Sequence, residues 1–216
     1  MRVICAEDDL PRAAASELSR SLQSALQRKP RVSLALSGGS TPLPALKLLA
    51  RADLDWTRVD IYQVDERVAP AGDSARNLVG LENALLDHVP ASLHPMLVEA
   101  ADIEDAAERY AAALPEALDV VHLGIGDDGH TASLVPGDPV LDVTDRQVAV
   151  TQPYRGHRRM TLTFPSFARA GAIIWIVSGA RKVPMVERLL AGDPTIPVGR
   201  VPQKRAVLIT DRALRS

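Results

Sequence analysis

One histidine stands where an apolar segment meets a glycine-rich turn. Residues 124–133, GIGDDGHTAS, follow the apolar run VVHL and place Asp128 two residues before His130. An imidazole has an ordinary pKa of about 6.5 and can exchange protons near neutral pH. A carboxylate nearby could orient the ring or share its proton. The pair indicates general acid–base chemistry, and the alternative is a His-Thr pair that only fixes the turn.

Three other polar clusters follow apolar runs in the same way. Residues 37–41 (SGGST) follow RVSLAL, residues 65–67 (DER) follow VDIYQV, and residues 178–182 (SGARK) follow GAIIWIV. Glycines allow a ligand to approach the backbone, and a helix beginning near Pro42 would offer free N–H groups to an anion. Lys182 lies where a helix dipole disfavours a cation, a conflict that a bound anion would offset. Each cluster alone could also be an ordinary turn, a helix cap or a surface ion pair.

Further polar residues could assist, and several ligand classes are disfavoured. Arg67 could stabilise an anion or an oxyanion, Asn77 could donate an amide hydrogen bond or cap a helix, and one residue of RGHRR (155–159) could face the same anion. The glycine turn lacks the GxGxxG and GxxxxGK[ST] patterns of nucleotide sites. Cys5 is the only cysteine and no paired-histidine spacing occurs, so we expect no metal site.

The elements that must position these residues alternate between helices and strands. Helical spacing marks residues 10–28, the segment after Pro42, and the segments 78–85, 103–114 and 180–190. Continuous apolar strands are expected at RVSLAL, VDIYQV, DVVHLGIG, GAIIWIVSG and AVLITD, with QVAVTQ and MTLTF as shorter strands at a sheet edge. This alternation predicts a single α/β domain over 1–216, a three-layer Rossmann-like fold with a mostly parallel sheet and helices on both faces. Because ligands bind beyond the carboxyl ends of such strands, the four clusters should share one rim.

Composition narrows the partners and the setting. The net charge of -2 and the 3% aromatic content of this 216-residue chain argue against nucleic-acid and anionic-membrane partners. No apolar run approaches the ~20 residues of a membrane span, and the N-terminal run VICA is too short for a signal peptide. We expect a cytoplasmic protein, a monomer or weak homo-oligomer, that acts on a small molecule.

Taken in order, the motifs resemble those of the 6-phosphogluconolactonases of the pentose phosphate pathway, within the glucosamine/galactosamine-6-phosphate isomerase superfamily. The matching motifs are LALSGGSTP, VDER, the DSxxN loop of residues 73–77, GIGDDGHTASLVPG, RMTLTFP and VSGARK. The resemblance covers nearly the whole chain. SGGSTP is shared more broadly with related deaminases, whereas the GxGxDGHTAS block is specific.

The resemblance implies hydrolysis of 6-phospho-D-glucono-1,5-lactone to 6-phosphogluconate without a cofactor. His130 would be the general base that activates water, Asp128 the carboxylate beside it, and Arg67 the cation that assists the substrate or the transition state. The substrate-binding residues would be Ser37, Gly38, Gly39, Ser40, Thr41, Asp65, Asn77, Arg159 and Lys182.

Two alternatives remain at this point. A glucosamine-6-phosphate deaminase would read DGHIAFNEP, with a glutamate where this chain reads DGHTASLVP. A sugar-phosphate sensor without catalysis would need only the SGGST turn and Lys182, and would leave Asp128 and His130 without a role.

Overall fold

The computed structural model describes residues 1–212, so the last four residues of the predicted domain lie outside the described residues. A seven-stranded sheet forms its centre, and all of its strand pairs are parallel. In spatial order the strands are β1 (Arg2–Cys5), β10 (Ala206–Thr210), β9 (Ala172–Val177), β6 (Val120–Leu123), β2 (Val32–Leu36), β3 (Val59–Gln63) and β5 (Ser92–His94). Every residue of β2 and β6 is buried, because helices cover both faces of the sheet.

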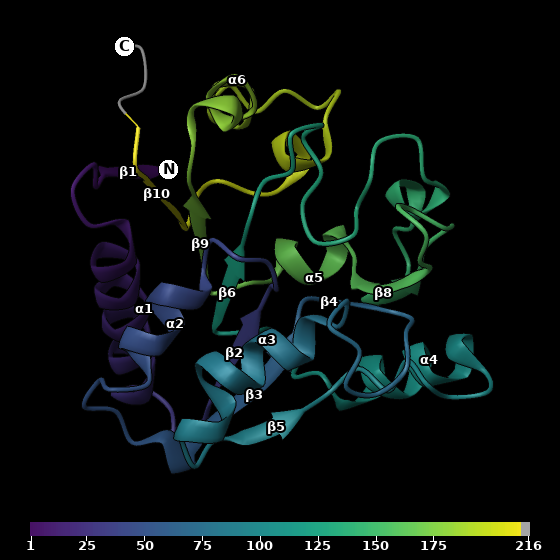
Figure 1. The fold of residues 1–216 in the computed structure, drawn as a ribbon, viewed down its shortest axis with the longest axis horizontal. Coiled ribbons are helices and arrows are strands. Elements are labelled where there is room, and N and C mark those ends of the chain that lie inside the picture. The colour runs from purple at the N-terminus through teal and green to yellow at the C-terminus, as the bar shows by residue number, and fades with distance from the viewer. Residues whose placement is uncertain (213–216) are drawn as a thin grey trace.

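Helices pack on the two faces of this sheet and give three layers (Figure 1). One apolar core joins the sheet to α1 (Leu10–Leu26), α2 (Leu43–Leu49) and α3 (Asn77–Ala84). The core of the other face includes residues of α4 (Ile103–Ala113), α5 (Phe164–Ala168) and α6 (Val183–Leu190). The predicted three-layer α/β fold with a mostly parallel sheet is confirmed.

A second, three-stranded antiparallel sheet corrects the prediction for the shorter strands. QVAVTQ and MTLTF contribute β7 (Val148–Val150) and β8 (Arg159–Leu162), but these strands do not extend the edge of the main sheet. They pair with β4 (Asp65–Arg67), which is therefore not the end of the preceding strand. Val64 makes the change of sheet, because its N–H donates to Leu36 in the main sheet while its carbonyl accepts from Leu162 in the small one.

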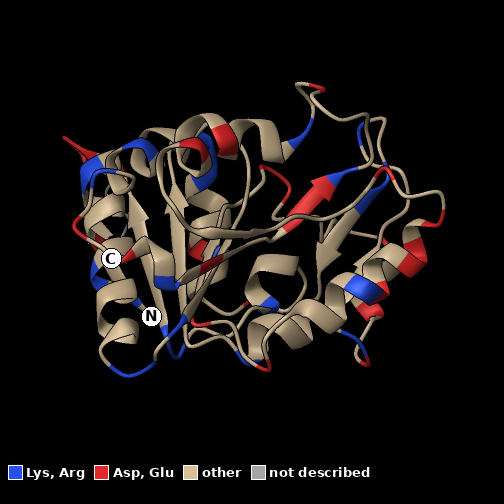
Figure 2. Ribbon diagram, turned by 90° about the horizontal axis from the view of Figure 1, so that it is seen from below, with Lys and Arg blue, Asp and Glu red and all other residues tan. Residues whose placement is uncertain are grey.

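Smaller differences occur at the ends of the elements. The expected helix over 180–190 consists of a 3₁₀ turn, Ala180–Lys182, followed by α6. Strands β1 and β5 had not been predicted, because they are edge strands of only four and three residues. Within residues 1–212 no helix combines the length and the apolar character needed to cross a membrane. Figure 2 shows acidic and basic residues mixed over the ribbon, without a face of one sign.

The strand order creates a crevice between β2 and β6. From β2 the chain passes to β3 on one side, whereas from β6 it passes to β9 on the other side. Loops leaving the carboxyl ends of β2 and β6 therefore diverge, and this is the place where open parallel sheets bind ligands.

Candidate active site

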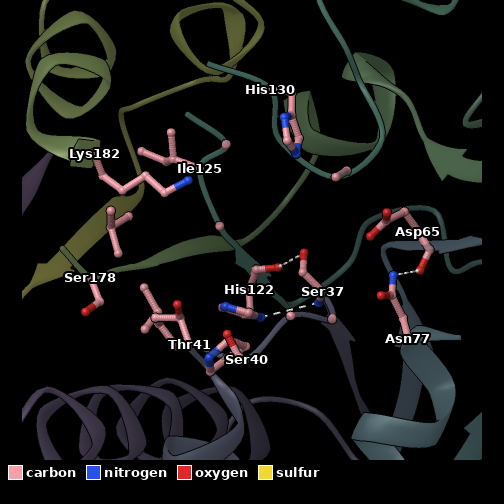
Figure 3. A pocket seen from close by; sticks show the side chains of 18 of the residues that line it. Ser37, Ser40, Thr41, Asp65, Asn77, His122, Ile125, His130, Ser178 and Lys182 are labelled. Atoms are coloured by element: carbon pink, nitrogen blue, oxygen red, sulfur yellow. Dashed lines mark hydrogen bonds between the residues drawn. The ribbon is translucent and has the colours of Figure 1, made fainter. Parts of the chain in front are cut away.

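A pocket of about 370 Å³ occupies this crevice. In Figure 3 its labelled side chains surround one space, with His130 and Lys182 across from Ser40 and Thr41. All the predicted site residues except Asp128 line it, namely Ser37, Gly38, Gly39, Ser40, Thr41, Asp65, Arg67, Asn77, His130, Arg159 and Lys182. The structure therefore brings the four clusters together. Three of them follow strands of the parallel sheet, whereas residues 65–67 form β4 of the small antiparallel sheet.

The glycine turn after β2 is held by contacts to neighbouring strands and loops. Ser37 donates through Oγ to the carbonyl of His122 at 3.0 Å and through its N–H to His122 Nδ1 at 3.3 Å. A Cβ atom at Gly38 would lie 2.2 Å from Asn77 Oδ1, so only glycine fits there. The helix expected at Pro42 begins one residue later, at Leu43. The turn is thus fixed with its hydroxyls facing the pocket (Figure 3).

Asp128 and His130 form a hydrogen-bonded pair on the loop after β6. One carboxylate oxygen of Asp128 contacts both His130 Nδ1 and the His130 backbone N–H. Partial burial opposes ionisation of Asp128, but interaction with His130 outweighs it and lowers the pKa of the carboxyl. An ionised acceptor keeps the proton of neutral His130 on Nδ1 and leaves Nε2 free to accept one. Gly126 is required beside them, because a Cβ there would lie 2.0 Å from His130 Nδ1.

Two arginines face each other across the small sheet. Arg67 of β4 is the register partner of Arg159 of β8, and both side chains line the pocket. Like charges on directly opposed strand residues repel each other. The Nε atoms of both arginines are buried and have no hydrogen-bond partner among residues 1–212. Burial, together with repulsion from Arg67, lowers the pKa of Arg159 although Asp65 acts in the opposite direction. An anion in the pocket would relieve the repulsion between the two guanidinium groups.

Asp65 and Asn77 line the pocket, but both also make hydrogen bonds within the protein. Ser133 Oγ donates to Asp65 Oδ2 at 2.6 Å, and burial raises the pKa of this carboxyl despite that hydrogen bond. Asn77 Nδ2 donates to the Asp65 carbonyl at 2.9 Å, so one amide proton already serves the protein itself. Both residues line the pocket, yet Asn77 also joins α3 to β4.

Lys182 is paired with an acid in this structure. Its Nζ lies 2.7 Å from Asp127 Oδ1, and the hydrogen bond from Lys182 lowers the pKa of the Asp127 carboxyl. The sequence suggested that a bound anion would offset the unfavourable position of the Lys182 charge near the start of a helix. In the structure Asp127 offsets it. Asp127 is about half exposed, so a phosphate could share Lys182 or replace Asp127 as its partner.

His122 is a pocket residue that sequence reasoning did not identify. Like His130 it lines the pocket, and it also contacts Ser37. Burial lowers the pKa of His122 to about 4, so the ring is neutral. Because Nδ1 accepts from Ser37, the ring proton is on Nε2, which is buried without a partner among residues 1–212. The available signal was a lone histidine inside the apolar strand VVHL.

The site thus combines a carboxylate-held imidazole with several cations and a hydroxyl-rich turn. Within residues 1–212 no group of three or more His, Cys, Asp and Glu side chains is arranged to hold a metal ion. Such an arrangement suits an enzyme that holds an anionic small molecule and transfers a proton to or from a neighbouring part of it.

Comparison with known proteins identifies the family. The family model of the glucosamine-6-phosphate isomerases/6-phosphogluconolactonase matches residues 6–210, and the chain belongs to this family. A 6-phosphogluconolactonase of Synechocystis is 37% identical over 191 residues, which cover 82% of this chain and 79% of the relative. A 6-phosphogluconolactonase of Caulobacter vibrioides is 36% identical over 220 residues, which cover 95% of this chain and 90% of the relative.

A solved structure agrees with this assignment at the level of the fold. The crystal structure of 6-phosphogluconolactonase from Thermotoga maritima superposes with a TM-score of 0.89 at 24% identity, over 97% of this chain and 98% of the other. The curated relatives are hydrolases of the family, and this chain is an enzyme of the same class.

Proposed function

We propose that this chain hydrolyses 6-phospho-D-glucono-1,5-lactone to 6-phospho-D-gluconate, in the oxidative branch of the pentose phosphate pathway. The observation that carries the proposal is the Asp128–His130 pair at the mouth of a pocket lined by Arg67, Arg159 and Lys182. It agrees with the similarity to 6-phosphogluconolactonases that are 36–37% identical to this chain.

The first chemical step uses the free imidazole nitrogen. His130 Nε2 takes a proton from water while the water oxygen forms a bond to the lactone carbonyl carbon. Asp128 accepts from Nδ1 and stabilises the imidazolium that results. Arg67 and Arg159 line the pocket, and their positive charges would stabilise the negative charge that develops on the carbonyl oxygen.

The second step opens the ring. The bond between the carbonyl carbon and the ring oxygen breaks, and His130 returns its proton to that oxygen, which becomes a hydroxyl. The new carboxylic acid then releases its proton to water. The phosphate would be held by the SGGST turn and Lys182, which line the wall opposite and beside His130 (Figure 3).

The residues after His130 favour hydrolysis over deamination. The sequence there is DGHTASLVP, and it lacks the glutamate expected of a glucosamine-6-phosphate deaminase.

We also propose that the enzyme works in the cytoplasm as a monomer or weak homo-oligomer, and that it needs no cofactor, nucleic acid or membrane.

A direct assay tests the activity. The purified chain should release acid from 6-phosphogluconolactone faster than the spontaneous reaction, which is subtracted, and should release no ammonia from glucosamine-6-phosphate. His130→Ala should lower kcat by about 10²- to 10⁴-fold. His88→Ala is the matched control, because His88 is exposed and contacts only the Asn83 carbonyl. Near-normal turnover by His130→Ala would refute the mechanism, and ammonia release would favour the deaminase.

A further inference from the structure

Tyr154 lies beside the Asp128–His130 pair although it belongs to another part of the fold. It begins a tight turn between β7 and β8, in which Tyr154 and His157 exchange backbone hydrogen bonds of 2.9 and 3.3 Å. Arg155 and Gly156, the two central residues, have φ values of 51° and 86°. Two positive φ values are the mark of the type I′ hairpin turn, which has one well-defined geometry. The turn therefore fixes the direction in which Tyr154 leaves the backbone.

The hydroxyl of Tyr154 reaches the carboxylate that holds His130. It donates to Asp128 Oδ2 at 3.0 Å, while the other oxygen, Oδ1, contacts the His130 ring and backbone. The two oxygens of one carboxylate are thus divided between the tyrosine and the histidine. The rings of Tyr154 and His130 also meet edge to face, with centroids 5.6 Å apart. Hydrogen bonds at both oxygens restrain the carboxylate from rotating away from the imidazole.

Two arginine side chains lie against the ring of Tyr154. The guanidinium groups of Arg155 and Arg159 each lie 5.1 Å from the centre of the Tyr154 ring. Cations at this distance attract an aromatic ring and restrain it. Arg155 and Arg159 line the pocket as well, so Tyr154 connects the ligand-facing cations to the acid–base pair. The charged and titratable groups around it are Asp128, His130 and these two arginines.

We propose that Tyr154 is a positioning residue of the hydrolytic reaction, and that it acts by holding Asp128 so that His130 keeps its proton on Nδ1. The proposal rests on the proposed function for the reaction itself. Tyr154 is not among the described residues that line the pocket, so it acts through Asp128 and not on the substrate. Packing alone would need only the ring, whereas this role needs the hydroxyl.

A double-mutant cycle separates the two possibilities. Tyr154→Phe should lower kcat on the order of tenfold, the effect of one hydrogen bond to a charged group, and should leave KM within about twofold. In an Asp128→Asn background the same change should add less than about twofold, because its partner is already altered. Equal losses in both backgrounds would overturn the proposal. Tyr62→Phe is the control, since its hydroxyl contacts only the Ala113 carbonyl.

A second measurement does not depend on catalysis. In protein labelled with ¹⁵N-histidine, the ring signals of His130 are identified by their loss in His130→Gln. Wild type should show the Nδ1-protonated form, and Tyr154→Phe should shift the population toward the Nε2-protonated form. The other four of the five histidines should be unchanged, which verifies the fold. Unchanged His130 signals in Tyr154→Phe would overturn the proposal, even if the lactone proved not to be the substrate.

Discussion

The change of Glu66 to Gln should destabilise the protein more than any loss of a surface ion pair. The buried carboxylate of Glu66 accepts hydrogen bonds from the backbone N–H groups of Arg67, Asn77 and Leu78 and from Gln63 Nε2. It also lies 3.2 Å from Nε of Arg76, which is itself buried. Through these contacts Glu66 fixes the start of α3 and the two pocket residues Arg67 and Asn77.

The expected magnitude follows from burial. Glu66→Gln keeps the shape but turns an acceptor oxygen into a donor that faces N–H groups. It also removes the buried counter-charge of Arg76. Breaking a buried ion pair from one side costs about 3–5 kcal/mol. Because Arg76 keeps a second partner, Glu99, we expect the lower end, about 3 kcal/mol of unfolding free energy. For a chain of this length this corresponds to a decrease in Tm of roughly 10 °C.

Urea unfolding followed by tryptophan fluorescence measures the effect, because Trp56 and Trp175 are both buried. Glu99→Gln is the matched control. Glu99 pairs with the same arginine but is 40% exposed, so its loss should cost less than about 1 kcal/mol. The reasoning would be refuted if the free energies of unfolding of Glu66→Gln and wild type differed by less than about 1 kcal/mol. It would also be refuted if Glu99→Gln were destabilised as much as Glu66→Gln.

Two further predictions concern pH. Burial lowers the pKa of His122 to about 4, so between about pH 6.5 and 4 the unfolded chain binds a proton that the folded chain does not. The free energy of unfolding of wild type should therefore fall by about 3 kcal/mol as the pH is lowered over that interval. The variant His122→Asn cannot titrate but keeps an acceptor for Ser37. Its free energy of unfolding should not show this decrease of about 3 kcal/mol. Burial raises the pKa of Asp65, so its ionised form opposes folding. Asp65→Asn should be more stable than wild type at pH 7 but less active, and its advantage in urea unfolding should vanish as the pH falls below about 3.9. An advantage that persists at low pH would contradict this assignment.

The central sheet could be predicted from the sequence for a physical reason. A parallel strand that is buried on both faces must be apolar at nearly every position, so β2, β6 and β9 appear as continuous apolar runs. Once such strands are parallel, their carboxyl ends lie on one edge, and the polar residues that follow them must meet. For this reason the sequence alone places the turn at 37–41, the Asp128–His130 pair and Lys182 together.

The small sheet could not be predicted in the same way. β4 has three residues, all charged, and nothing in its sequence shows that the chain changes sheets at Val64. The pairing of Arg67 with Arg159 joins segments far apart in the chain, and neither strand has a long pattern of its own. His122 was missed for a related reason, since its contact with Ser37 spans 85 residues and its own strand looks like ordinary core.

The pocket residues come from two different sheets, and the two sheets contribute differently to the specificity of the site. The main sheet supplies the glycine turn, the Asp128–His130 pair and Lys182, which any doubly wound sheet could place at its switch point. The small sheet supplies Arg67 and Arg159, and the turn between β7 and β8 supplies Tyr154. In the proposed mechanism Arg67 and Arg159 assist the developing charge and Tyr154 holds Asp128, so the antiparallel sheet would turn a general anion-binding crevice into a site that can hydrolyse an ester. Changes in β4, β7 and β8 should therefore alter turnover more than they alter the binding of a phosphate group.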